Sequence, residues 1–234
     1  MPGKKEMTDL DTAPPPEKRP RKKNQETREK ILDAAQQAFA RYPYHSASVR
    51  IISKLGGVDH ALINYHFGSK AALFKAVLRR MMDQRGELEK SWFASVKPMG
   101  ATRGFSVFLD YILDDYRKRP GLFHIAALNF RQVNYDNPIP GYELLEEFIK
   151  SDVAHMKGSL DLAVPDHEAE MFIRSMSTLI IGFLGSAGSH AHMMGMEPDS
   201  MVYFNWVKET ALYTLLPRFK LMVQQASAST VREV

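Results

Sequence analysis

The sequence predicts an all-α protein in which a group of short helices precedes a larger helical domain. Apolar residues recur every three or four positions along most of the chain, and no segment keeps the alternating pattern of a strand. Helix-breaking pairs, such as Pro98 with Gly100 and Pro120 with Gly121, divide these stretches at helix-like intervals. The first 24 residues are proline-rich and basic, with few aliphatic side chains, so we expect them to form a disordered arm.

The first two helices are expected in the segment that follows the arm. The first has one apolar face, formed by Ile31, Ala34, Ala35, Ala38 and Phe39. Val49 and Ile52 continue the same core on a short second helix, for which Ser46 or Ser48 is the N-cap. Gly57 ends this helix, because glycine adopts left-handed backbone angles without a side-chain penalty.

A third helix is expected after Asp59, a natural N-cap, with Ile63 and Phe67 buried. Its remaining side chains are small, polar or aromatic and suit base edges and phosphates. Two short helices around a glycine turn form a helix-turn-helix, expected at about residues 47–67 of a DNA-binding domain that spans residues 25–85. The residues predicted to contact DNA are Ser48, Arg50, His60, Ala61, Asn64, Tyr65, His66 and Lys70.

This region resembles the TetR-type bacterial transcriptional repressors. The resemblance covers about the first third of the chain, a spaced set that is more specific than a single motif. It runs through Thr27–Ala35, Phe39–Ala40, Ser48–Arg50, Gly57–Val58, Tyr65–Phe67 and Ser69–Leu73. Pro43 and Ala47 stand where the family usually has Gly and Thr, and Asn64 stands where a phosphate-binding Tyr is usual. The resemblance implies a ligand pocket in the second domain and a four-helix bundle between two copies.

Individual roles follow from these features. We expect Asn64 to read a base, while Ser48, Tyr65 and Lys70 hold phosphates by resemblance and by their positions at helix ends. The basic arm suits the minor groove or the phosphates, with a solvated tail as the alternative. Ser69 is expected to cap a fourth helix that leads into the second domain.

The second domain is expected over residues 86–225, before a flexible tail at 226–234. Its helices are indicated around residues 105–112, 122–130, 144–156, 165–191 and 198–216. Many of its large side chains could line a cavity for an apolar ligand, although each of them could equally belong to a packed core. The predicted ligand-binding residues are Phe105, Phe108, Phe123, Phe130, Arg131, Phe148, Phe172 and Met176, with Arg131 as the polar anchor.

The last two helices are expected to form a homodimer surface. Gly182, Gly185 and Gly188 remove bulk and allow a second helix to approach closely, and Tyr203 and Trp206 suit the same contact. The alternative is a close crossing inside one subunit. Self-association is favoured because one helix-turn-helix reads few base pairs, and two-fold dimers are the commonest symmetric assembly.

Composition and missing motifs restrict the class of protein. The chain has no cysteine, and its N-terminus lacks the apolar run of a signal peptide. Arg174 interrupts the apolar stretch Met171–Gly188, so we expect a cytoplasmic protein without a membrane partner. No catalytic motif is present, and we predict neither an enzyme nor a cofactor. His190 and His192 do not share a helix face, so no metal site is predicted.

We therefore predict a ligand-responsive DNA-binding regulator that acts as a repressor. Its partners would be a palindromic double-stranded DNA operator, a second copy of the chain, and a mainly apolar small molecule that releases the operator. A helical small-molecule carrier or metal sensor is the alternative, followed by an enzyme of unrecognised type. Salt-dependent binding to a short palindrome would separate the regulator from both.

Overall fold

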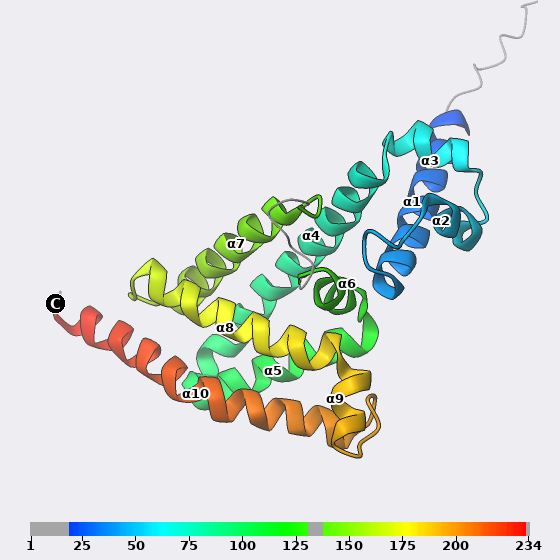
Figure 1. Cartoon of the computed structure of the whole chain (residues 1–234). Helices are drawn as coiled ribbons and strands as arrows, with labels where there is room; N and C mark the ends of the chain where they lie inside the picture. The colour runs from blue at the N-terminus through cyan, green and yellow to red at the C-terminus, as the bar shows by residue number, and fades with distance from the viewer. Residues whose placement is uncertain (1–18, 131–137, 233–234) are drawn as a thin grey trace, which may run out of the picture.

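The computed structural model describes residues 19–130 and 138–232, and within these ranges it contains helices and no strand, which confirms the all-α prediction. Their order runs from a compact N-terminal group to a larger helical body (Figure 1). The helices are α1 (Arg19–Arg41), α2 (Val49–Gly56), α3 (His60–Phe67), α4 (Lys70–Val96), α5 (Gly100–Lys118), α6 (Gly121–Phe130), α7 (Tyr142–Leu160), α8 (Asp166–Gly185), α9 (Ala187–Met193) and α10 (Met201–Arg232), with a 3₁₀ turn at Lys97–Met99.

The predicted caps hold the helix-turn-helix in place. Ser48, and not Ser46, caps α2, with its hydroxyl oxygen accepting from Ile51 N at 3.2 Å. The Asp59 carboxylate caps α3 at 2.7 Å from Ala61 N. Gly57 between them has a φ of +54°, the left-handed conformation that the turn requires. The expected cap of α4 by Ser69 is also present, at 3.1 Å from Ala72 N.

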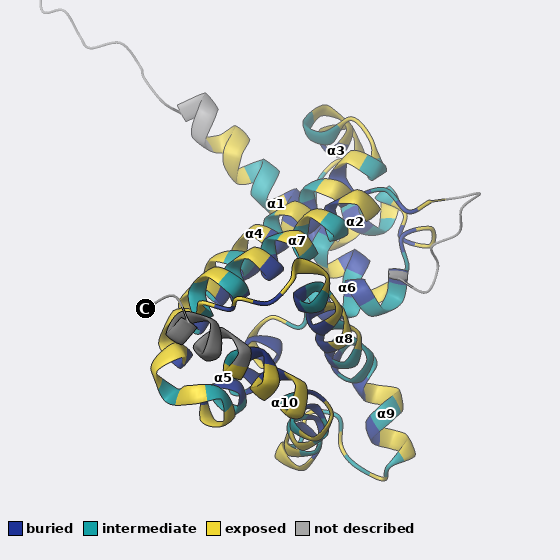
Figure 2. Ribbon diagram, turned by 90° about the vertical axis from the view of Figure 1, so that its left-hand side faces the viewer, coloured by how far each residue is buried: buried dark blue, intermediate teal, exposed yellow. Residues whose placement is uncertain are grey.

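Two apolar cores organise the molecule. One core joins α1–α3 to the first half of α4 and takes in Ile125 of α6 and Leu144 of α7. The other lies among the second half of α4, α5, α7, α8 and α10. Helix α4 belongs to both cores, and the expected domain boundary between residues 85 and 86 falls inside it. Figure 2 shows these buried faces turned inward and the exposed faces turned outward.

Both expected chain ends are more helical than predicted. Helix α1 begins at Arg19, so residues 19–24 of the arm expected over residues 1–24 are helical, and residues 1–18 lie outside the described ranges. Pro20 suits the first turn, and the Arg, Lys and Gln that follow are good helix formers. Helix α10 passes through Pro217, where Phe219 and Met222 keep it packed in the core, and its bounds extend to Arg232, into the tail expected at residues 226–234.

The single helix expected over residues 165–191 is two helices. Helices α8 and α9 meet at Ser186 with a bend of 76°. At Gly185, the last residue of α8, an added Cβ would lie 2.5 Å from Phe123 O, so α8 ends pressed against the backbone of α6. Within the described ranges, no single helix meets the length and hydropathy expected of a membrane span, and one pair, the bent α8 and α9, meets them jointly.

Candidate DNA-binding and effector sites

Helix α3 presents an exposed surface on a buried anchor. Ile63 is 1% exposed and fixes the helix to the core, whereas Tyr65 is 75% exposed. Of the other predicted contacts, His60, Ala61 and Asn64 are exposed beside it, and His66 is half-buried. Leu62 is 40% exposed on the same helix and was missed, because periodicity alone does not separate it from a core leucine. Its apolar side chain suits a thymine methyl group.

The remaining predicted DNA contacts, Ser48, Arg50 and Lys70, lie near the start of α2 and at the start of α4. Ser48 and Arg50 are exposed at the start of α2. Lys70 is half-buried: its Nζ donates to Tyr44 O at 2.9 Å and lies 4.4 Å from the centre of the Tyr44 ring. Burial lowers the pKa of Lys70. Lys70 therefore holds the α1–α2 connection as well as facing the α3–α4 turn.

A cavity of about 560 Å³ lies between α4, α6, α7 and α8. Its walls are mainly aliphatic and aromatic, and three residues of α4 contribute to them: Phe74, Leu78 and Met82. Its polar side chains include Asn129 of α6 and Ser177, Thr178 and Arg174 of α8. Arg174 is paired with Glu146 and Glu170, each at 2.8 Å. This volume is in the range of small-molecule binding sites.

Of the eight predicted ligand-binding residues, Phe148 lines this cavity. Four others surround a separate void of about 10 Å³, space for one water at most, and are therefore packed core: Phe105, Phe108, Phe172 and Met176. Phe123 packs edge-on against Tyr116, with the ring centres 5.4 Å apart. The Arg131 residue and the Phe130 side chain lie outside the described part of the structure. We therefore relocate the candidate effector site to the cavity between α4, α6, α7 and α8.

The predicted dimer residues separate into internal and open positions. Gly185 packs on α6 inside the subunit, and Tyr203 is fully buried, its hydroxyl donating to Phe183 O at 2.9 Å. Trp206 is half-buried against Phe183, with ring centres 4.9 Å apart. These positions support the internal crossing that the sequence left as an alternative. Among the described residues, nothing lies within 4 Å of a Cβ added at Gly182 or Gly188.

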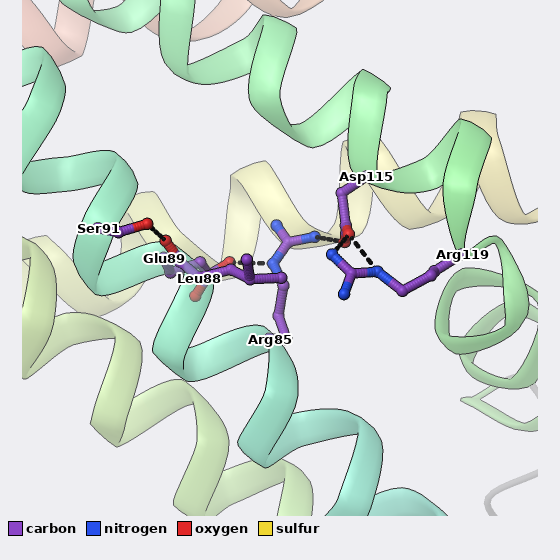
Figure 3. Close-up of polar contacts among 6 residues, drawn as sticks. All are labelled: Arg85, Leu88, Glu89, Ser91, Asp115 and Arg119. Atoms are coloured by element: carbon purple, nitrogen blue, oxygen red, sulfur yellow. Dashed lines mark hydrogen bonds and ion pairs between the residues drawn. The ribbon is translucent and has the colours of Figure 1, made fainter.

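A buried cluster of charges lies between the two cores. Arg85 Nε donates to Glu89 at 2.6 Å, and its Nη1 donates to Asp115 at 3.2 Å (Figure 3). Arg119 reaches the same Asp115 from the end of α5. Asp152 of α7 faces this cluster; its burial, followed by the charge and hydrogen bonding of Glu89, raises the pKa of Asp152 to about 10. Asp152 is therefore a neutral acid at pH 7.

Comparisons with known proteins agree with this architecture. The model of the bacterial regulatory proteins of the tetR family matches residues 31–77. The regulator RutR of Escherichia coli is 29% identical over 203 residues, covering 87% of this chain and 79% of RutR. The regulator TtgR of Pseudomonas putida is 30% identical over 106 residues, which are 44% of this chain and 50% of TtgR.

Solved structures show the same fold. A TetR regulator of Legionella pneumophila aligns with a TM-score of 0.58 at 19% identity, covering 81% of this chain and 97% of that one. A TetR-family regulator of Agrobacterium tumefaciens gives 0.58 at 16% identity, covering 82% and 98%. An exposed recognition helix on an all-helical body, with these relatives, defines a DNA-binding transcriptional regulator and not an enzyme. Residues 31–77 match the tetR family, and most of the chain is similar in sequence to RutR and in fold to TetR-family regulators.

Proposed function

We propose that this regulator is a repressor that binds a palindromic operator as a homodimer and leaves it when a mainly apolar molecule fills the α4–α6–α7–α8 cavity. The observation that carries the proposal is the position of the cavity. Phe74, Leu78 and Met82 of its wall belong to α4, the helix that starts directly after the recognition helix. A ligand that alters the packing of α4 therefore acts on the support of the DNA-reading unit.

The cavity wall supports an effector with a long apolar part and one polar end. Phe148, Ile149 and Ile181 offer apolar surface, and the polar groups Arg174, Ser177 and Thr178 belong to α8. Arg174 replaces Arg131 as the anchor that the described structure offers, although its ion pairs with Glu146 and Glu170 compete for it. Fatty-acyl compounds and lipophilic drugs fit this pattern.

The outer faces of α8 and α10 are the proposed surface for a second copy. Large apolar side chains are exposed there, including Met171 on α8 and Val202 and Tyr213 on α10. Val202 and Tyr213 are eleven positions apart and therefore share one face of α10. Two copies are needed because an operator half-site is read by one recognition helix, and successive major grooves recur about every 34–36 Å.

The test begins with duplex DNA selected from a random-sequence pool by the purified protein. The expected sequence is a palindrome, bound with a strong dependence on salt concentration. Dodecanoate, hexadecanoyl-CoA and a lipophilic quaternary ammonium compound are then titrated into the complex. Release by at least one of them supports the proposal. Release by hydrophilic metabolites or metal ions alone would contradict the apolar effector, and failure to select any duplex would contradict the operator.

A further inference from the structure

One residue of the cavity wall also holds the DNA-binding unit. Asn129 of α6 is 4% exposed, and its Oδ1 accepts from the backbone N–H of Tyr44 at 2.8 Å. Its Nδ2 donates to Ile125 O at 2.7 Å, one turn earlier on α6. Only this orientation of the Asn129 amide satisfies both partners, because the backbone N–H of Tyr44 needs an oxygen acceptor and the backbone carbonyl of Ile125 needs an N–H donor. Tyr44 lies in the connection between α1 and α2, 85 positions away in the sequence.

Tyr44 is also the point where other contacts from the cavity converge. Phe74 lines the cavity and packs against the Tyr44 ring, with ring centres 4.9 Å apart. The backbone carbonyl of Tyr44 accepts a hydrogen bond from Lys70 Nζ at 2.9 Å. Lys70 follows the turn that ends the recognition helix, and Ser48, the cap of α2, is four positions after Tyr44. Contacts therefore run from the cavity to Tyr44 and on to Lys70 at the end of the helix-turn-helix, and the chain leads from Tyr44 to the cap of α2 within four residues.

We propose that Asn129 is the positioning residue through which an occupied cavity acts on DNA binding, an inference that rests on the proposed function. A ligand that contacts or displaces the Asn129 amide withdraws the acceptor from Tyr44 N–H. A buried donor left without a partner is unfavourable, so the α1–α2 connection moves to regain one. Lys70 and the cap of α2 then shift together with the α1–α2 connection. The two recognition helices of a dimer consequently no longer match successive major grooves.

The first experiment needs neither DNA nor effector. Asn129→Leu keeps a side chain of similar size and removes the acceptor. Amide hydrogen exchange of the segment containing Tyr44 is compared between wild type and variant, and we expect exchange in the variant to be about tenfold faster because the buried bond is lost. Ser177→Ala is the matched control, because Ser177 lines the same cavity from α8 and should leave exchange at Tyr44 unchanged. Equal exchange in wild type and Asn129→Leu would overturn the inference.

The second experiment measures binding to the duplex selected by the wild-type protein. Asn129→Leu should bind it about tenfold more weakly without any effector, and saturating dodecanoate should weaken it further by less than about threefold. Asn129→Asp, held as a neutral acid by burial, retains an acceptor for Tyr44 N–H and a donor for Ile125 O, and should restore slow exchange. This variant also guards against a Leu variant that fails to fold. Dodecanoate should speed exchange at Tyr44 in the wild type.

The outcomes separate the two proposals. A wild-type protein that binds no duplex contradicts the proposed function, while the exchange comparison still decides whether Asn129 holds Tyr44. If dodecanoate releases the wild-type protein from the duplex, and Asn129→Leu binds the duplex and is released to the same extent, the role of Asn129 is contradicted. The proposed function then remains intact. Fast exchange in both Asn129 variants would also count against the inference, because the retained acceptor would then have no effect.

Discussion

At the residue scale, the exposed side of α3 leads to a prediction for Asn64. Its side chain is exposed, and its Nδ2 lies 3.3 Å from His60 Nδ1. This contact is weak, so the amide is available to bond a base edge. An amide can bond both N6 and N7 of adenine. Asn64→Ala should therefore weaken operator binding by about 1–3 kcal/mol and relax the preference at one position of each half-site. Competition assays with single-base operator variants measure this, and an equal loss on all sequences would contradict base reading.

Lys70 combines an internal contact with a proposed phosphate contact. One of its ammonium protons is donated to Tyr44 O, and two remain for DNA. Lys70→Met retains the apolar stem, and we expect weaker binding to every sequence, with the slope of log K against log salt reduced by about 0.9. The measurement is a salt titration of the selected duplex. A weaker complex with an unchanged slope would show that Lys70 acts only by holding the α1–α2 connection.

At the element scale, the junction of α6 and α8 depends on one glycine. A Cβ added at Gly185 would lie 2.5 Å from Phe123 O and 2.6 Å from Ala127 Cβ, so Gly185→Ala forces the helices apart. We expect a loss of about 1–3 kcal/mol in the free energy of unfolding, measured in urea. The matched control is Gly182→Ala on the same helix, where no described residue comes within 4 Å of the added Cβ, and a gain of up to about 1 kcal/mol is expected. Equal effects of both substitutions would contradict the close crossing.

The buried charges of α4, α5 and α7 give a pH prediction. The pKa of Asp152 is raised to about 10 in the folded protein by burial and by Glu89, whereas an exposed aspartate titrates near 4. Between these values the folded state binds more protons than the unfolded state, so this contribution to stability is complete below about pH 4 and is lost as the pH rises towards 10.

Asp152→Asn mimics the neutral acid and should remove this dependence. Relative to the variant, wild-type stability should fall by about 1 kcal/mol per pH unit between pH 5 and pH 8, as measured by urea unfolding. Far-UV circular dichroism checks that both chains stay helical. A difference between the two proteins that does not change with pH would show that Asp152 is ionised in the folded state.

The sequence predicts elements better than it predicts their contacts. Caps and turns depend on nearby residues, so Asp59, Ser69 and Gly57 could be assigned from local chemistry. The cavity depends on which helix faces meet, and Phe105 and Phe148 have the same pattern in sequence although only Phe148 reaches it. The proposed role of Asn129 depends on a hydrogen bond to Tyr44, 85 positions away in the sequence, and a local sequence pattern cannot predict such a contact. The close packing of Gly185 on α6 is likewise a tertiary contact between distant parts of the chain.

At the scale of the whole molecule, the proposed operator requires two recognition helices held at a fixed distance. Tyr213 is 87% exposed on α10 and shares its face with the exposed Val202. Neighbouring exposed apolar side chains of this kind mark a surface for a partner. Tyr213→Asp places a charge on this face, and burying an unpaired charge against a second copy is unfavourable. We expect the wild type to have twice the 26.6 kDa mass of one chain in sedimentation, and the variant to approach the single-chain mass at low micromolar concentration.

The consequence for DNA binding follows from geometry. A single chain reads one half-site, so Tyr213→Asp should lose most of its preference for the palindrome over a duplex with one half-site, while its helix content stays unchanged. Tyr142→Asp is the matched control, since Tyr142 is also an exposed tyrosine but lies at the start of α7, away from the outer faces of α8 and α10. A Tyr213→Asp variant that keeps the wild-type mass would place the contact between copies on another surface, and the α8–α10 proposal would then have to be abandoned.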